Sequence, residues 1–209
     1  MKSFASLVVV SLFAGLVAAV PTPADTAPLC GTTYYPTILQ QLSEASPNTV
    51  GANTAATSGD FHVSQTVITG SPSDRIYQLV GFQGIPSGSF GCELALTFPA
   101  GYPITSSVGG VAGPTPMLNV TTVLRNNPSA IAYPNGFTFN SFPTQLGPSQ
   151  GPFGTVSAAA GTTVSINSES CDSNLAFVFS IASWTGTSAG VEFAEHKSPL
   201  AGVYLTASC

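Results

Sequence analysis

Charged side chains are scarce in this sequence. Asp, Glu, Lys and Arg make up only 6% of the 209 residues, and the four basic residues are outnumbered by nine acidic ones. Binding to nucleic acid requires enough lysine and arginine to neutralise phosphate groups. Attachment to an anionic membrane surface also requires a basic cluster. The composition therefore excludes both of these function classes.

Signatures of metal and cofactor binding are also missing. The two histidines, His62 and His196, have no partner at the spacing of a metalloprotease motif. No cysteine has a second ligand at the short spacing of a zinc site. The sequence thus predicts no metal and no cofactor. Ser64 lies two residues from His62, with Asp60 nearby, but spacing along one strand does not supply the geometry of a catalytic triad.

The first residues follow the order of a secretory signal peptide. Lys2 precedes an apolar run from Leu7 to Val17, which ends in Ala18 and Ala19. The run is shorter than the roughly 20 apolar residues that span a bilayer, which disfavours the alternative of a membrane anchor.

We therefore expect three parts along the chain. Residues 1–19 are a signal peptide cleaved after Ala19, residues 20–29 are a flexible leader rich in Pro, Thr and Ala, and residues 30–209 form a single domain. The mature protein is expected to be extracellular or associated with a cell wall.

Four cysteines, Cys30, Cys92, Cys171 and Cys209, all fall in the mature part. An even number in a secreted chain indicates two disulfide bonds, for which three connectivities are possible. We favour Cys30–Cys209, because the termini of a domain often lie close together. The remaining pair, Cys92–Cys171, would join two segments that both have the pattern of core strands.

The clearest strand pattern runs from Leu175 to Ser183. Leu175, Phe177, Phe179 and Ile181 alternate with the small residues Ala176, Val178, Ser180 and Ala182. Because side chains alternate across a strand, this pattern predicts a bulky face on a core and a small-residue face turned outward. Cys92, Leu94, Leu96 and Phe98 show the same alternation.

The remaining pattern favours an all-β fold. The sequence has 21 Gly and 17 Pro, short apolar segments at irregular spacing, and a turn signal at residues 71–74. Ile38, Leu39, Leu42 and Ala45 are spaced as in a helix that begins near Pro36 and ends at Pro47. We predict a two-sheet antiparallel β-sandwich of about 9–10 strands with one short N-terminal helix.

Asn119 begins the glycosylation sequon Asn119-Val120-Thr121. Leu118, Val120 and Leu124 define the inner face of the strand that contains it, so Asn119 should point outward. Alternation and sequon therefore both predict an exposed, glycosylated asparagine.

Several phrases of the sequence resemble one family of small secreted fungal proteins. They are Phe98 to Ser107 (FPAGYPITSS), Phe153 to Val156 (FGTV), Ile166 to Cys171 (INSESC) and Asn174 to Phe179 (NLAFVF). The family is described as the ubiquitin 3 binding protein But-type C-terminal domain, and the likeness runs from about Tyr34 to the end of the chain. The resemblance implies a fungal source and, through the family name, a ubiquitin-like protein partner. It implies no catalytic residues.

Aromatic residues give the best indication of a binding site. Rings with a polar tip stack on sugars, and the loops at the ends of a sandwich are common sites. The candidate binding residues are Tyr102, Tyr133, Trp184 and Tyr204. They favour a non-catalytic extracellular protein with cell-wall polysaccharide as partner.

Two alternatives stay open. The first is a secreted hydrolase that uses a pair of carboxylates, drawn from Glu93, Glu169, Asp172, Glu192 and Glu195. The second is recognition of the ubiquitin-like partner that the family name implies.

Overall fold

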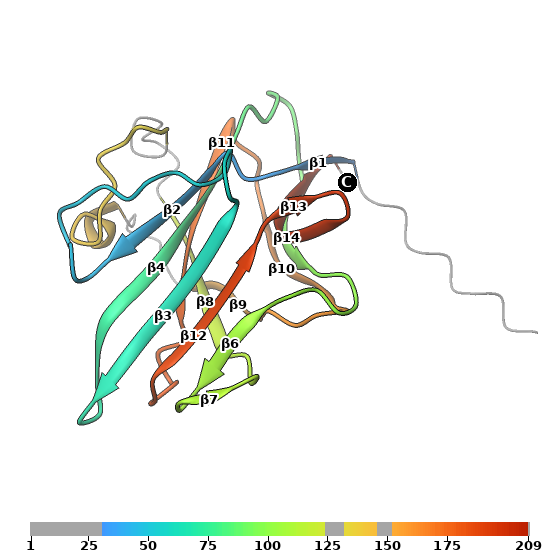
Figure 1. Cartoon of the computed structure of the whole chain (residues 1–209). Helices are drawn as coiled ribbons and strands as arrows, with labels where there is room; N and C mark the ends of the chain where they lie inside the picture. Colours follow the sequence, from blue (N-terminus) through green and yellow to red (C-terminus); the bar gives the residue numbers. More distant parts are fainter. Residues whose placement is uncertain (1–30, 124–131, 146–151, 209) are drawn as a thin grey trace, which may run out of the picture.

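The computed structural model describes residues 31–123, 132–145 and 152–208, which form two antiparallel sheets (Figure 1). The smaller sheet has the strand order β1-β14-β5-β10, with β13 paired to β14. Its strands are β1 (Thr32–Tyr34), β14 (Leu200–Ala207), β5 (Cys92–Thr97), β10 (Thr163–Glu169) and β13 (His196–Lys197).

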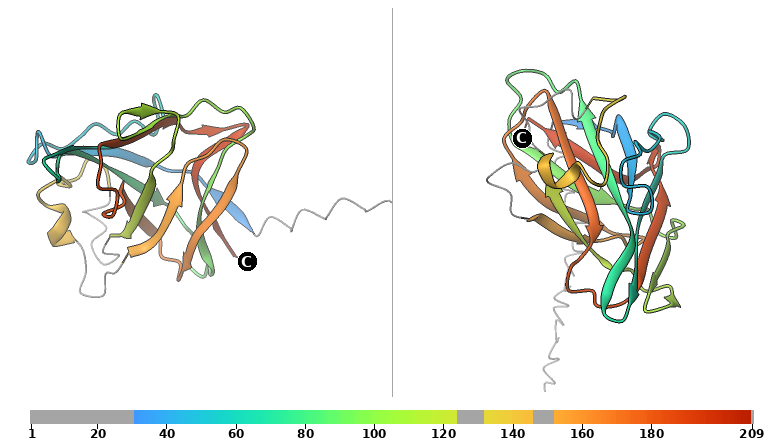
Figure 2. Two further views of the ribbon diagram at one scale, coloured as in Figure 1. Left: turned by 90° about the horizontal axis from the view of Figure 1, so that it is seen from below. Right: turned by 90° about the vertical axis from the view of Figure 1, so that its left-hand side faces the viewer.

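The larger sheet has the order β7-β6-β12-β3-β4-β11-β8-β9, with β2 paired to β4. Its strands are β7 (Val111–Ala112), β6 (Thr105–Val108), β12 (Ala189–Ala194), β3 (Asp60–Ile68), β4 (Ser71–Gln83), β11 (Asn174–Ile181), β8 (Met117–Thr122), β9 (Pro152–Ser157) and β2 (Ile38–Ser43). One of the two sheets is curled into a half-barrel, and Figure 2 shows the fold from two further sides. The predicted all-β sandwich is confirmed.

The main core fills the space between the sheets. Leu175, Phe177, Phe179 and Ile181 of β11 face it from the larger sheet, and Leu94 and Leu96 of β5 face it from the smaller one. Phe61 stacks on Phe193 with ring centroids 4.4 Å apart and meets Phe179 edge to face at 5.3 Å. The bulky faces predicted from alternation are therefore the ones that the fold buries.

A second core lies on the opposite face of the larger sheet, where the sequence predicted an outward surface. Ala176 and Val178 of β11 are buried there with Phe137, together with Ile38, Leu42, Leu79 and Val123. Phe137 belongs to the segment 132–145, which lies beside β2 in Figure 1 and contains the short 3-10 helix η1 (Phe142–Gln145). The Gln40 side chain donates a hydrogen bond to the Phe137 carbonyl at 2.7 Å, which fastens this segment to β2.

The predicted N-terminal helix is wrong, because residues 38–43 form strand β2. Leu39 faces the main core, whereas Ile38 and Leu42 face the second one. A strand buried on both faces contains apolar residues on both sides, so its pattern also fits a helical repeat. Tertiary pairing with β4 decides between the two structures.

The predicted turn at residues 71–74 is also displaced. β4 already begins at Ser71, and the hairpin turns at Thr69 and Gly70, which have φ angles of 50° and 81°. Positive φ is readily adopted by glycine, which places the turn there. The structure describes fourteen strands rather than nine or ten. The additional ones are β2, which was expected to be a helix, and the short strands β1, β6, β7 and β13, which leave no clear pattern in the sequence.

The predicted Cys92–Cys171 disulfide is confirmed, with the two Cα atoms 5.1 Å apart. Glu169, the last residue of β10, pairs with Cys92 on β5, and Cys171 lies two residues further on. The bond therefore fixes the place where the chain leaves the smaller sheet to begin β11 in the larger one. Cys30 and Cys209 lie outside the described residues, so their pairing stays a prediction. Thr32 and Ala207, each two positions along the chain from one of these cysteines, pair between β1 and β14.

Candidate functional site

Two pockets open on the outer face of the larger sheet, and Gln65 on β3 lines both of them. We call them the hairpin pocket, beside the β3–β4 hairpin, and the relay pocket, over β3, β12 and β6.

The hairpin pocket forms where the sheet splits. β4 pairs with β11 only as far as Gln78↔Phe179, while the rest of β4 continues to pair with β3 down to Ser71↔Ile68. A register shift in the β3–β4 ladder lies between Ser64 and Thr66, and such irregularities bend a strand pair away from the sheet. The gap has a volume of about 220 Å³ and extends to Asn119 on β8.

Polar groups line the hairpin pocket: Gln65, Arg75, Tyr77, Asn119, Ser180, Ser183 and Thr185. The Asn119 Oδ1 atom is buried and accepts no hydrogen bond. Asn119 does face outward, as predicted, but its side chain is half-buried rather than freely exposed. Whether it carries a glycan stays a prediction.

The one cation in this pocket, Arg75, is compensated. Its guanidinium binds both carboxylate oxygens of Glu44, at 2.7 and 3.0 Å, and lies 5.2 Å from the Phe139 ring. Hydrogen bonding by Arg75 lowers the pKa of the Glu44 carboxyl, and the same pair raises the pKa of Arg75. The ion pair with Glu44 therefore holds the Arg75 guanidinium, with its N–H donors, in a fixed position and balances its positive charge.

Trp184 is the candidate aromatic residue that lies nearest in the chain to the hairpin pocket. It lies in the loop between β11 and β12, between the lining residues Ser183 and Thr185, and 64% of its surface is exposed. Gln65 holds this loop by donating hydrogen bonds to the carbonyls of Thr185 and Thr187, at 2.8 and 3.1 Å. The exposed ring is thus carried by an anchored loop.

The other three candidate aromatics do not join Trp184. Tyr102 packs on Phe98 and donates a 2.6 Å hydrogen bond to the Ala194 carbonyl, at the end of β12 remote from Trp184. Tyr204 is buried within β14, and burial raises the pKa of its hydroxyl. Tyr133 is exposed but lies on the segment 132–145. None of the four lines a described pocket, and only Trp184 is adjacent in the chain to residues that do.

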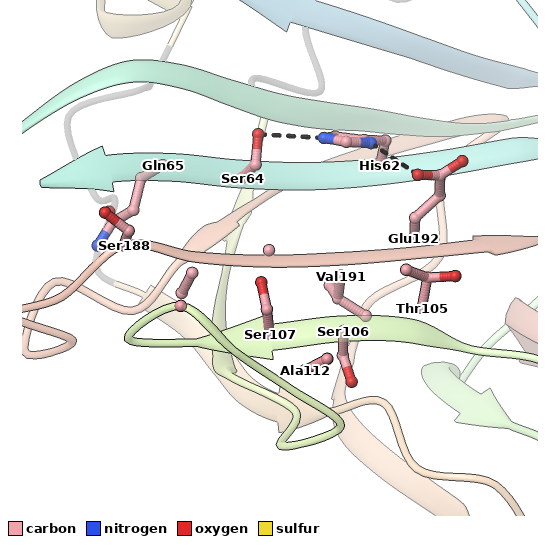
Figure 3. Close-up of a pocket in the computed structure, with 13 residues that line it drawn as sticks. His62, Ser64, Gln65, Thr105, Ser106, Ser107, Ala112, Ser188, Val191 and Glu192 are labelled. Carbon is pink, nitrogen blue, oxygen red and sulfur yellow. Dashed lines mark hydrogen bonds and ion pairs between the residues drawn. The ribbon is translucent and has the colours of Figure 1, made fainter.

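The relay pocket has a volume of about 390 Å³ and contains a contiguous polar chain (Figure 3). The His62 ring lies between Ser64 and Glu192: its Nε2 atom is 3.1 Å from the Ser64 hydroxyl and its Nδ1 atom is 3.3 Å from the Glu192 carboxylate. The sequence suggested Asp60 as the acidic partner of this pair. The structure brings Glu192 to His62 instead.

The strand pairing explains this arrangement. Glu192 on β12 lies directly opposite His62, and Gly190 lies opposite Ser64. β3 leaves β4 at Ser64, and the side chain of the buried Gln78 accepts the backbone N–H of His62 at 3.1 Å. This hydrogen bond fixes the backbone that carries the histidine. No spacing within one segment could reveal a contact between positions 62 and 192.

Residues 186–190 have the Gly-x-Ser-x-Gly pattern of a hydrolase nucleophile elbow, a signal that the prediction from sequence overlooked. Its serine, Ser188, lines the relay pocket. The Ser188 hydroxyl accepts the Val67 backbone N–H at 2.9 Å, and the run leads from a loop into strand β12. An elbow requires a strand followed by a helix, so the pattern here is structural.

Glu195 follows β12 and places its carboxyl against β14. It accepts the Val203 backbone N–H at 2.9 Å and contacts the Cα side of Gly202, where a Cβ atom would collide with the carboxylate. Tyr35, His196 and Lys197 line the small pocket beside it. Burial raises the pKa of Glu195 well above its ordinary value of 4.5, partly offset by the Val203 hydrogen bond.

This raised pKa predicts a pH dependence of stability. The unfolded chain loses the Glu195 proton near pH 4.5 while the folded protein still holds it. The stability contribution is therefore complete below that pH and declines as pH rises through the folded-state pKa. We expect Glu195→Gln to remove this decline, so that the variant gains stability relative to wild type as the pH rises above about 4.5. Urea unfolding across that range measures the difference, and parallel curves at every pH would contradict the prediction.

The remaining acids do not form a catalytic pair in these pockets. Glu192 and Glu195 each line a different pocket as its only acidic residue, whereas glycoside hydrolysis by two carboxylates needs both in one cleft. Glu93 and Glu169 belong to the smaller sheet, and Asp172 is exposed in the loop after it. Within the described ranges, no group of three or more His, Cys, Asp or Glu residues could hold a metal ion, and no helix is long and apolar enough to cross a membrane.

Comparison with known proteins identified no relative of this chain. No family model matches the chain, and no curated protein matches it. The resemblance to the But-type C-terminal domain family therefore stays a prediction based on the phrases quoted above.

Proposed function

We propose that this is a secreted, extracellular or cell-wall protein that binds neutral carbohydrate at the hairpin pocket. The observation that carries the proposal is the buried Asn119 Oδ1 atom without a hydrogen-bond partner, in a pocket lined by amides and hydroxyls. Two of its lining residues, Ser183 and Thr185, flank the exposed Trp184 in the chain. Buried polar atoms are nearly always hydrogen-bonded, so a ligand hydroxyl is a fitting donor to Asn119.

The charges and shape of the pocket favour a sugar over other ligands. Glu44 compensates the Arg75 charge, and no carboxylate is among the residues that line the pocket, which suits an uncharged ligand. The hydroxyls of Ser180, Ser183 and Thr185 can donate to and accept from sugar hydroxyls. Trp184 offers a flat apolar face on which a pyranose ring can stack.

The proposed source and compartment come from other observations. The apolar run before Ala19 supports secretion, and so does the Cys92–Cys171 disulfide, since such bonds persist in oxidising compartments. The resemblance to fungal secreted proteins supports cell-wall glucan, chitin or mannan as the ligand. Binding of a ubiquitin-like protein rests on the family name alone, and titration with ubiquitin tests it.

Trp184→Ala is expected to weaken carbohydrate binding at least tenfold, because the stacking surface is lost; a tenfold change corresponds to about 1.4 kcal/mol. Trp184 is the only tryptophan in the chain, so a change in wild-type fluorescence on titration with soluble glucan, chitin or mannan oligosaccharides reports directly on the site. Sedimentation with the insoluble polysaccharides measures the variant.

Phe90→Ala is the matched control, since Phe90 is an aromatic residue of similar exposure, 59%, in the loop between β4 and β5. It should bind as wild type does. Thr121→Ala removes the sequon but keeps the Asn119 side chain in the pocket, so this variant tests whether a glycan on Asn119 blocks the pocket. If wild type neither sediments with any of the three polysaccharides nor changes its fluorescence, with or without the sequon, the proposed function is wrong.

A further inference from the structure

We propose that Ser64, His62 and Glu192 form a nucleophile relay that hydrolyses short-chain acyl esters in the relay pocket. This activity goes beyond the proposed carbohydrate binding and does not depend on it, since none of the three residues lines the hairpin pocket.

The geometry of the three side chains has the order that acyl transfer requires. A serine nucleophile needs a histidine base at hydrogen-bond distance, and the second ring nitrogen of that base needs an acid that orients it. His62 meets the Ser64 hydroxyl through Nε2 and the Glu192 carboxylate through Nδ1. With the proton on Nδ1, the ring points its N–H side toward the Glu192 carboxylate, 3.3 Å away, and accepts a hydrogen bond from Ser64.

The surrounding strands hold this order in place. Glu192 and His62 are cross-strand partners on β12 and β3, and the hydrogen bond from the His62 backbone to the buried Gln78 fixes the position of the histidine. Gly190 lies opposite Ser64 and adds no side chain beside the hydroxyl. The space that this glycine leaves belongs to the pocket, so a substrate carbonyl can reach Ser64.

The lining of the pocket indicates the class of substrate. Apart from the relay, the pocket is lined mainly by small or hydroxyl-bearing residues, among them Thr105, Ser107, Gly110, Ala112 and Gly190. Such a lining suits an acetyl or similarly short acyl group. Glu192 is the only acidic residue that lines the pocket, so an uncharged ester fits better than an anionic one.

The reaction proceeds in two steps, acylation of Ser64 and hydrolysis of the acyl-enzyme. The Ser64 oxygen attacks the ester carbonyl as its proton passes to His62, the carbon–oxygen bond to the alcohol breaks, and His62 returns the proton to the departing alcohol. Water then attacks the acyl-Ser64 ester with His62 again as base, which releases the carboxylic acid and restores Ser64. Ser64 and His62 are the catalytic residues, and Glu192 is a positioning residue.

A fluorophosphonate probe and 4-nitrophenyl acetate test the proposal on the full mature protein. We expect intact-mass spectrometry to show one phosphonyl adduct, peptide mapping to place it on Ser64, and Ser64→Ala to abolish both the adduct and ester hydrolysis. His62→Gln should slow hydrolysis about 100-fold, within the range that a general base contributes. Glu192→Gln should slow it less, by lowering kcat while KM stays unchanged, since Glu192 orients the base and does not bind the substrate.

Ser71→Ala is the matched control, since Ser71 is an exposed serine at the start of β4 and is not among the residues that line the pocket; it should keep the wild-type rate. Circular dichroism establishes that each variant is folded. Absence of an adduct on folded wild type, an adduct on Ser188, or equal hydrolysis by wild type and Ser64→Ala would each overturn the proposal. A failure of carbohydrate binding leaves these measurements unaffected, so the two proposals fail separately.

Discussion

Replacement of both Cys92 and Cys171 by alanine is expected to lower the free energy of unfolding by about 2–5 kcal/mol. The bond links residues 79 positions apart, so its loss releases a long loop in the unfolded chain and increases the entropy of that state. It also frees the connection between β10 and β11, where the chain passes from one sheet to the other. Urea unfolding under non-reducing conditions measures the effect.

Peptide mapping under non-reducing conditions provides the control for this prediction. Wild type should give a fragment that joins the Cys92 and Cys171 peptides and, if the predicted second bond exists, another that joins Cys30 and Cys209. The double variant should retain only the second. A Cys30–Cys92 or Cys92–Cys209 fragment from wild type, or a variant as stable as wild type, would show that the bond does not have this role.

The disulfide and the main core could be predicted from sequence because both follow from local pattern. Cys92 begins the alternation that continues through Leu94 and Leu96, and Cys171 precedes that of β11. A strand with one bulky face has little choice of which face to bury. The two sheets and the Cys92–Cys171 pairing follow once those faces meet.

The second core could not be predicted in the same way. Ala176 and Val178 are small enough to stand on an exposed face, and nothing local to β11 reveals that residues 132–145 cover them. Residues 132–145 also cover β2, so that strand has apolar residues on both of its faces. This pattern led to the incorrect prediction of a helix. Both errors have one cause, which is a tertiary contact between segments far apart in the sequence.

The candidate sites also combine features that the sequence could predict with features that depend on the pairing of distant strands. Exposure of Trp184 could be anticipated from its position in a polar loop. The hairpin pocket, however, depends on where pairing between β4 and β11 stops. The relay depends on the register between β3 and β12, which brings Glu192 to His62. Register is a property of two strands together, so neither strand alone contains it.

Phe137→Ala is expected to lower the free energy of unfolding by about 3–5 kcal/mol, the usual cost of truncating a buried phenylalanine. Phe137 is 1% exposed and packs with Val178 and Leu79 in the second core. Its removal leaves a cavity against β11 and weakens the attachment of residues 132–145 to β2. Urea unfolding followed by circular dichroism measures the change.

Tyr133→Ala is the matched control because Tyr133 belongs to the same segment but is 41% exposed. Exposed positions of this kind change stability by about 0.5 kcal/mol or less. If the second core is a structural part of the domain, the two substitutions differ by several kcal/mol, although they lie four residues apart. If Phe137→Ala lowers the free energy of unfolding no more than Tyr133→Ala does, the segment 132–145 does not stabilise the larger sheet. The outer face of that sheet would then be the free surface that the alternation of β11 predicted.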